Sequence, residues 1–178
     1  MAQTAKATIK VDIGGLRSSA LDIGANNETI GALVSLAWPN GTATSQVNEI
    51  WSEGSRSLAA SANDSFDLTS LTQLDAAGAT VRPAVAFSVV KLVYIRNTSA
   101  TGSLIVGGGT GAGGASDAWA LATGLLSADA ATTNVSAGGF LLWTDPAGVA
   151  VTNTSADVLN LQGVGATQTY DIIIMGES

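Results

Sequence analysis

The segment Val89-Val90-Lys91-Leu92-Val93-Tyr94-Ile95 carries the main indication of the fold of this 178-residue chain. Six of its seven residues are apolar, and most of those are β-branched or aromatic, which favours a strand over a helix. Comparable short segments follow at Leu104–Val106, Phe140–Trp143 and Ile172–Met175, each bounded by glycine or turn residues. The chain therefore places its most apolar residues in short, buried strands.

The beginning of the chain shows a different, alternating pattern. Apolar residues occupy every second position of Ile9–Ile13, and Lys10 and Asp12 occupy the positions between them. This pattern predicts a half-buried strand. A turn at Gly14-Gly15 is expected to follow, after which Leu21–Ile23 resumes the alternation.

Two further turns are indicated by their residue types. The apolar stretch Ile30–Trp38 ends at Pro39-Asn40-Gly41, a typical turn sequence. Asp145-Pro146-Ala147-Gly148 has Asp, Pro and Gly at the first, second and fourth positions, as in a type I turn. We expect it to join the strands Phe140–Thr144 and Val149–Thr152.

Many short strands at a spacing of roughly ten residues predict an all-β fold, an antiparallel β-sandwich with little helix. Phe66 and Leu68 are expected to face inward. The one candidate helical turn is Ser116–Leu126, for which an irregular loop is an equal alternative. Residues 1–43 form either an extended N-terminal arm or the first strands of the sandwich, and residues 44–178 form the sandwich itself.

The composition argues against catalysis. The chain contains no histidine and no cysteine, the residues most used for acid–base catalysis near neutral pH, thiolate chemistry and zinc binding. Its serines therefore have no histidine base to activate them. We expect no enzyme activity, no catalytic residues, no metal site and no cofactor.

The charge distribution argues against two classes of partner. The net charge is −7, and the seven basic residues are scattered along the chain. Nucleic-acid binding and attachment to an anionic membrane both depend on clustered basic residues. No apolar run approaches the ~20 residues of a membrane-spanning helix. We expect neither partner.

A glycine-rich segment, Gly107–Gly114, resembles a dinucleotide-binding motif at first sight. Gly109, Gly111 and Gly114 match G-x-G-x-x-G, and Asp129 follows at a suitable distance. The motif requires a helix and then a parallel strand, which the following residues do not indicate. A loop between strands is the favoured interpretation, and without a Lys-Ser or Lys-Thr pair it cannot be a P-loop.

The aspartates and tryptophans each have a functional and a structural interpretation. Paired aspartates serve glycosidases, but most of these lie beside turn residues, which favours turn hydrogen bonds. No run of the D-x-D-x-D-G type indicates calcium. The tryptophans suit core or subunit-interface packing better than a sugar-stacking platform. The residues concerned are Asp64, Asp67, Asp75, Asp117, Asp129, Asp145, Asp157 and Asp171, and Trp38, Trp51, Trp119 and Trp143.

The order of segments between residues 44 and 178 resembles small virion proteins of tailed bacteriophages. The resemblance consists of strand and turn patterns and includes no catalytic motif. The segments that carry it are Gln46–Trp51, Arg56–Ala60, Ser65–Thr69, Asp75–Gly78, Lys91–Asn97, Leu104–Gly108, Gly138–Leu142 and Tyr170–Gly176.

This resemblance implies a jelly-roll-like sandwich that serves as a capsid decoration or cement protein. Such a protein would be a homotrimer that is made in the host cytoplasm, binds the major capsid protein on the outer surface of the virion and stabilises contacts between capsomers. The alternative is a fibre, knob or carbohydrate-binding module that recognises host glycans. The first 43 residues lie outside the resemblance, and we expect them to add to a neighbour's sheet edge or to clasp the shell.

Overall fold

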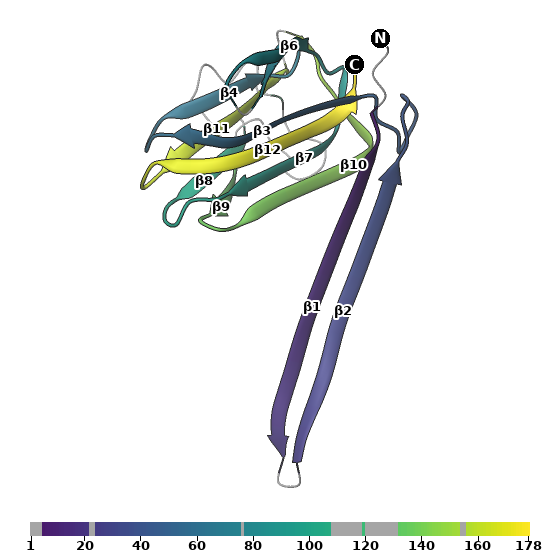
Figure 1. Cartoon of the computed structure of the whole chain (residues 1–178), viewed down its shortest axis with the longest axis vertical. Coiled ribbons are helices and arrows are strands. Elements are labelled where there is room, and N and C mark those ends of the chain that lie inside the picture. The colour runs from purple at the N-terminus through teal and green to yellow at the C-terminus, as the bar shows by residue number, and fades with distance from the viewer. Residues whose placement is uncertain (1–4, 22–23, 76, 108–118, 120–131, 154–155) are drawn as a thin grey trace.

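A computed structural model describes residues 5–21, 24–75, 77–107, 119, 132–153 and 156–178 (Figure 1). These residues form twelve strands and no helix. The strands are β1 (Ala7–Leu21), β2 (Gly24–Trp38), β3 (Glu49–Leu58), β4 (Asn63–Asp67), β5 (Leu71–Leu74), β6 (Thr80–Val85), β7 (Val89–Asn97), β8 (Ser103–Gly107), β9 (Thr132–Ser136), β10 (Phe140–Ala150), β11 (Val158–Val164) and β12 (Gln168–Glu177).

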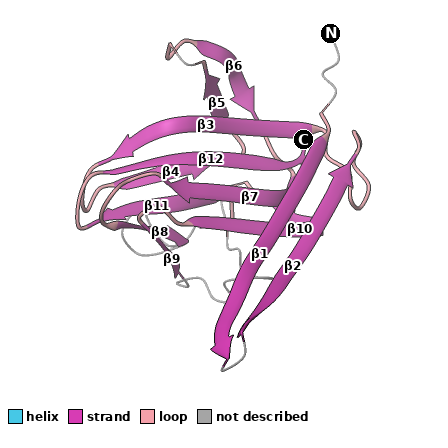
Figure 2. Cartoon of the chain, turned by 60° about the horizontal axis from the view of Figure 1, so that its bottom comes forward, coloured by secondary structure: helices cyan, strands magenta, loops and turns pink. Residues whose placement is uncertain are grey.

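Eight of the strands form two antiparallel sheets that pack as a sandwich (Figure 2). One sheet has the order β10-β7-β12-β3 and the other β4-β11-β8-β9. If these eight strands are numbered 1 to 8 in chain order, the first sheet has the order 6-3-8-1 and the second has the order 2-7-4-5. This is the strand arrangement of a jelly roll. The predicted all-β antiparallel sandwich is confirmed.

The core lies between the two sheets and is built from the apolar segments identified in the sequence. Trp51 packs edge-on against Phe66, with 5.4 Å between ring centroids, and donates its indole N–H to the Thr72 carbonyl at 3.0 Å. Phe66 and Leu68 are both buried, as predicted. The inward residues of the two sheets are Val93, Ile95, Trp143, Ile172 and Ile174 on one side and Leu104, Val106, Val135, Leu159 and Leu161 on the other.

The first two strands join neither sheet of the sandwich. β1 and β2 pair with each other in an antiparallel ribbon that projects from the sandwich (Figure 1), and we call this ribbon the hairpin arm. The expected turn at Gly14-Gly15 is wrong, because β1 continues through both glycines, which pair with Gly31 and Ile30. Uninterrupted pairing with the opposite strand overrides the local tendency of two glycines to form a turn.

The Asp145–Gly148 segment has the predicted turn chemistry but a different role. The Asp145 side chain accepts a hydrogen bond from the Ala147 N–H at 2.9 Å, and Gly148 has a φ of +81°. The residues on either side both pair with β7, with a register shift between Thr144 and Val149. The segment is therefore a bulge within β10 and not a connection between two neighbouring strands.

Two other predictions concern residues that the structure does not describe. The glycine-rich motif with Asp129 and the candidate helical turn Ser116–Leu126 lie outside the described ranges, apart from Gly107 and Trp119. Gly107 ends β8, with a φ of +140°.

Candidate functional site

The hairpin arm is the feature of this molecule that most needs a partner. Its two 15-residue strands, at ~3.4 Å per residue, give a length of about 50 Å. Both long edges of the ribbon lack a neighbouring strand among the described residues. An isolated two-stranded ribbon is marginally stable in water, and unpaired strand edges are templates for association with other chains.

The strand register gives the arm one apolar face and one mostly polar face. Ile9 lies opposite Leu36, Val11 opposite Val34 and Ile13 opposite Ala32, so these side chains share a face. The intervening residues put Lys10, Asp12 and Ser35 on the other face, with Leu33 as its one large apolar side chain in the range 8–14 and 31–37. The alternation of Ile9–Ile13 is therefore confirmed, whereas the part predicted at Leu21–Ile23 reaches beyond the described residues.

Exposure along the apolar face increases with distance from the sandwich. At the base, Trp38 is only 3% exposed, and Ile9 is half-buried. Farther along, Val34 is 50% exposed and Ile13 is 65% exposed. The same face is thus covered at its base and open beyond it. The prediction of a half-buried strand holds only for the base.

The base of the arm is covered by the outer surface of the sandwich. Ala7, Trp38 and Val47 form a buried cluster with Leu92 of β7, and Tyr94, Leu142 and Met175 pack around it. These sandwich residues lie on the face of the β10-β7-β12-β3 sheet that points away from the main core. This contact explains why β7 is apolar on both faces, because each face packs against something.

A buried lysine fixes the loop at the base of the arm. Lys91 is fully buried, and its ammonium donates to the carbonyls of Ala43 and Gln46 at 2.8 and 2.9 Å. It also forms an ion pair with Glu177 at 2.5 Å. The loop after β2 is thereby tied to β7 and to the end of β12, which holds the arm in a defined orientation to the sandwich.

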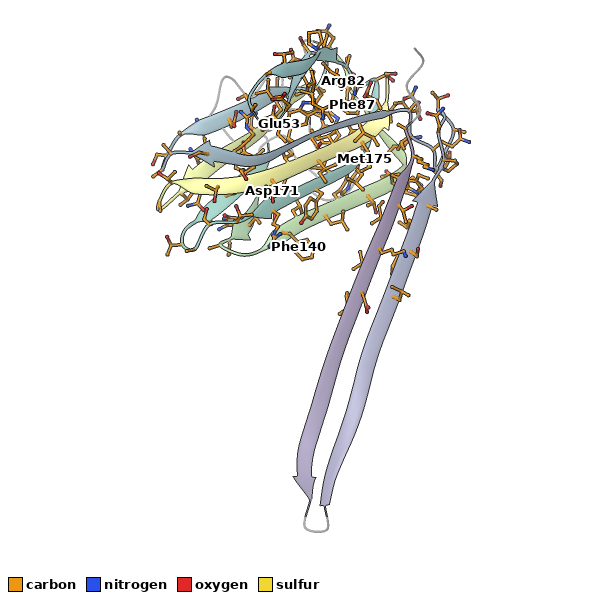
Figure 3. The ribbon with its side chains drawn as sticks, in the orientation of Figure 1. Glu53, Arg82, Phe87, Phe140, Asp171 and Met175 are labelled. Carbon is orange, nitrogen blue, oxygen red and sulfur yellow. The ribbon has the colours of Figure 1, made fainter. Side chains whose placement is uncertain are left out.

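The covered cluster continues on the sheet as an apolar strip that is half-buried along most of its length and exposed at its end. Leu142 lies opposite Tyr94, and Tyr94 lies opposite Ile173, so the three form one row across the sheet. Phe140 extends the strip to the sheet's edge, 6.2 Å from Tyr94 between ring centroids, and is 62% exposed. Figure 3 shows Met175 on the side of the sheet nearer the arm and Phe140 at its border. We call Tyr94, Phe140, Leu142 and Ile173 the sheet strip.

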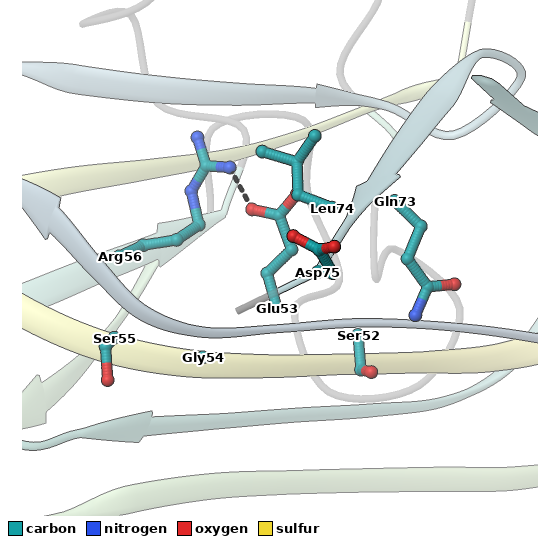
Figure 4. A pocket seen from close by; sticks show the side chains of 8 residues that line it. All are labelled: Ser52, Glu53, Gly54, Ser55, Arg56, Gln73, Leu74 and Asp75. Carbon is teal, nitrogen blue, oxygen red and sulfur yellow. Dashed lines mark hydrogen bonds and ion pairs between the residues drawn. The ribbon is translucent and has the colours of Figure 1, made fainter. Parts of the chain in front are cut away.

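A polar groove lies on another part of the sandwich, between β3 and the β5–β6 hairpin (Figure 4). It has a volume of about 610 Å³ and is lined by Ser52, Glu53, Gly54, Ser55, Arg56, Gln73, Leu74 and Asp75. Arg56 binds Glu53 and forms a bidentate contact with Asp64, at 3.0 and 3.1 Å. The charged groups here are thus engaged with one another.

The Arg56 network joins the two sheets. Asp64 of β4 also accepts a hydrogen bond from the Tyr170 hydroxyl of β12 at 2.5 Å. Burial raises the pKa of Tyr170 above its ordinary value, and the hydrogen bond to Asp64 raises it further. The hydroxyl therefore remains a donor at neutral pH. This arrangement binds β3, β4 and β12 together and uses Arg56 and Asp64 for structure.

The described aspartates confirm the expected turn chemistry at three positions. Asp67 accepts from the Thr69 N–H, Asp75 from the N–H groups of Ala77 and Ala79, and Asp145 as described above. Asp64 and Asp171 instead link separate strands, since Asp171 accepts from the Ser55 N–H at 2.9 Å. Asp157 is buried, whereas Asp117 and Asp129 lie outside the described residues.

The four tryptophans are all buried, in agreement with the packing interpretation. Trp119 and Trp143 pack edge-to-face with centroids 5.9 Å apart, and Trp119 donates to the Ala150 carbonyl at 3.2 Å. Trp38 holds the base of the arm, and Trp51 lies in the core. No tryptophan is therefore exposed as a stacking platform for sugars.

Sequence reasoning identified the alternating strand of the arm but not the two surfaces that it forms. The signal for the sheet strip was present: Leu92 and Tyr94 are apolar at positions that an exposed sheet face would fill with polar residues. The Arg56–Asp64–Tyr170 network has no local signal, because Asp64 and Tyr170 are 106 positions apart.

The described residues contain no group of three or more acidic side chains arranged to hold a metal ion. In the same part of the chain, no helix is long and apolar enough to cross a membrane. Comparison with known proteins gave no match to any family model, curated protein or solved structure.

Proposed function

We propose that this chain is a non-enzymatic structural protein of a virion, a decoration or cement protein of the capsid's outer surface. It would assemble as a homotrimer, bind the major capsid protein and stabilise contacts between capsomers. The observation that carries the proposal is the hairpin arm, which holds an uncovered apolar face away from a well-packed sandwich. The resemblance of residues 44–178 to tailed-phage virion proteins suggests the setting.

The physical properties of the arm suit attachment to a large assembly. Its strands are about 50 Å long and only their first residues are anchored, so most of the arm lies beyond the sandwich and can reach a neighbouring subunit. It offers both strand edges and side chains, and strand addition uses the first for affinity and the second for specificity. The sandwich, with its buried lysine at the base of the arm, acts as the rigid support.

The glycan-binding alternative has less support. Its proposed platform required exposed tryptophans, and all four are buried. The polar groove beside β3 offers hydrogen-bonding groups but is lined by no aromatic side chain, and Arg56 is already engaged by Glu53 and Asp64. We therefore retain the structural role as the conclusion.

A binding assay on capsids tests this function. The test variant replaces residues 11–34 with Asn-Gly, a sequence suited to a two-residue turn, and keeps the anchored pairs Ala7–Trp38 and Ile9–Leu36. We expect the full chain to sediment with empty capsids that lack this protein, and the shortened chain to remain in the supernatant while still folded. Failure of the full chain to bind any capsid shell would reject the proposed function.

A further inference from the structure

Two apolar surfaces of this chain remain open, and both begin at the same covered cluster. One is the distal apolar face of the arm, represented by Val34 and Ile13. The other is the sheet strip, which is half-buried at Tyr94, Leu142 and Ile173 and opens at Phe140. At the base of the arm these two kinds of surface already pack together, where Ile9 and Trp38 meet Leu92 and Tyr94. The molecule itself shows that they are complementary.

We infer that the distal apolar face of the arm binds the sheet strip of a second copy of this chain. The contact would continue the interface at the base of the arm, with the same residue types on each side. A single chain cannot make this contact for itself, because its arm leads away from the sandwich (Figure 1) and is held by Trp38 and the Lys91 contacts. This inference rests on the proposed function, in which the arm is an assembly element.

Pairing between two arms explains the observations less completely. Two arms packed face to face would cover Val34 and Ile13 but would leave Phe140 exposed on both molecules. Arm-to-strip packing covers both surfaces and places Lys10 and Asp12, on the other face of the arm, in water. Arg96 and Asp171, which lie opposite each other at the polar border of the sheet strip, would mark the rim of the interface.

The contact joins different surfaces on the two copies, and this has a consequence for assembly. Each copy offers one arm and one strip, so copies associate head to tail. Such a series closes into a ring when the rotation between neighbours allows it. A homotrimer, as the proposed function has it, is one such ring.

A pair of neighbouring arm residues gives a matched test of association. Val34 lies on the apolar face, whereas the adjacent and more exposed Leu33 lies on the polar face. We expect Val34→Ser and Phe140→Ser each to weaken self-association about tenfold in sedimentation velocity. Each substitution removes an apolar side chain that is exposed in the single chain and that the contact between copies would bury. Leu33→Ser should leave it unchanged. Equal effects of Leu33→Ser and Val34→Ser would overturn the inference.

Disulfide trapping identifies which surfaces meet. The chain has no cysteine, so Val34→Cys and Phe140→Cys can be introduced into separate, differently tagged full-length chains. A disulfide forms only where the two Cα atoms come within about 7 Å, so oxidation of the mixture should give mainly the mixed dimer. Predominant Val34→Cys homodimers would show arm-to-arm pairing, and no cross-link at any concentration would show that positions 34 and 140 do not meet; either result overturns the inference. Capsid binding by an uncross-linked, monomeric chain would overturn the inference, and the homotrimer with it, while leaving the proposed attachment to the capsid intact.

Discussion

The sandwich and the hairpin arm both present apolar strand faces, with opposite results. In β7, the inward face is covered by the opposite sheet, and Leu92 on the outer face is covered by the base of the arm. In β1, one face is apolar, and only its first residues are covered. The difference shows that an apolar strand face specifies a surface to be buried, whereas the strand sequence does not specify which surface covers it. In this protein the arm extends beyond the part of the sandwich able to cover it.

This comparison predicts that stability belongs to the sandwich and association to the arm. The largest effect on folding is expected in the core. Trp51→Ala removes an indole that packs on Phe66 and bonds the Thr72 carbonyl, and should lower the free energy of unfolding by about 3–5 kcal/mol. Urea unfolding followed by far-UV circular dichroism measures this change. A loss below about 1 kcal/mol would mean that the two sheets are not packed around this residue.

The second effect concerns the junction between the two regions. Lys91→Met keeps the apolar stem but leaves the Glu177 carboxylate and the Ala43 and Gln46 carbonyls without their shared donor. Removing one partner of a buried ion pair costs about 3 kcal/mol or more, so the unfolding midpoint should fall clearly. Limited proteolysis should also cut residues 39–47 first. Unchanged protection of that loop would contradict the anchoring role of Lys91.

A smaller effect is expected where the two sheets of the sandwich are linked. The raised pKa of Tyr170 means that the folded chain holds the phenolic proton more tightly than the unfolded chain does. Its contribution to stability is therefore complete below the ordinary tyrosine pKa of about 10 and is lost as the pH rises above it.

Tyr170→Phe tests this link between the sheets. At pH 7 the substitution should cost about 1.5 kcal/mol, because the bond to the Asp64 carboxylate is lost. Between pH 9 and about 11, the stability of the variant should decline less steeply than that of the original chain. Parallel urea-unfolding profiles for the two proteins would contradict the assignment.

The smallest effect on folding is expected on the arm. Val34→Ser and Leu33→Ser both change exposed residues and should each alter the unfolding free energy by less than about 0.5 kcal/mol at low protein concentration. Thermal unfolding at several concentrations should then separate the two variants, since only the original chain and Leu33→Ser gain stability by association. A large loss for Val34→Ser in the dilute chain would show that its apolar face is already covered within one molecule.

The sequence was sufficient to predict the sandwich because its signals are local. Short β-branched segments with turn residues between them indicate strands, and burial of Phe66 and Leu68 follows from the same alternation. The Asp145–Gly148 turn was also identified by its residues. Its position inside β10 was not, because turn chemistry does not reveal whether the flanking residues pair with each other or with a third strand.

The candidate site could be predicted only in part, because its features depend on distant pairings. The alternation of Ile9, Val11 and Ile13 was clear, but the glycines after it suggested a turn where the strand continues. Whether Val34 is covered depends on how far along the arm the surface of the sandwich extends, and no local sequence pattern contains that information. The absence of histidine and cysteine argues against several kinds of active site but contains no information on which surface binds a partner.

Hydrogen exchange in the arm tests most directly the claim that its open face is closed by another molecule. Amide exchange of residues 10–14 and 31–35 would be followed by mass spectrometry as the concentration of the full chain is raised about 100-fold, with core strand β7 as the internal reference. We predict that exchange in the arm slows with concentration, together with exchange around Phe140, while β7 does not change. Arm exchange that is independent of concentration would contradict the account.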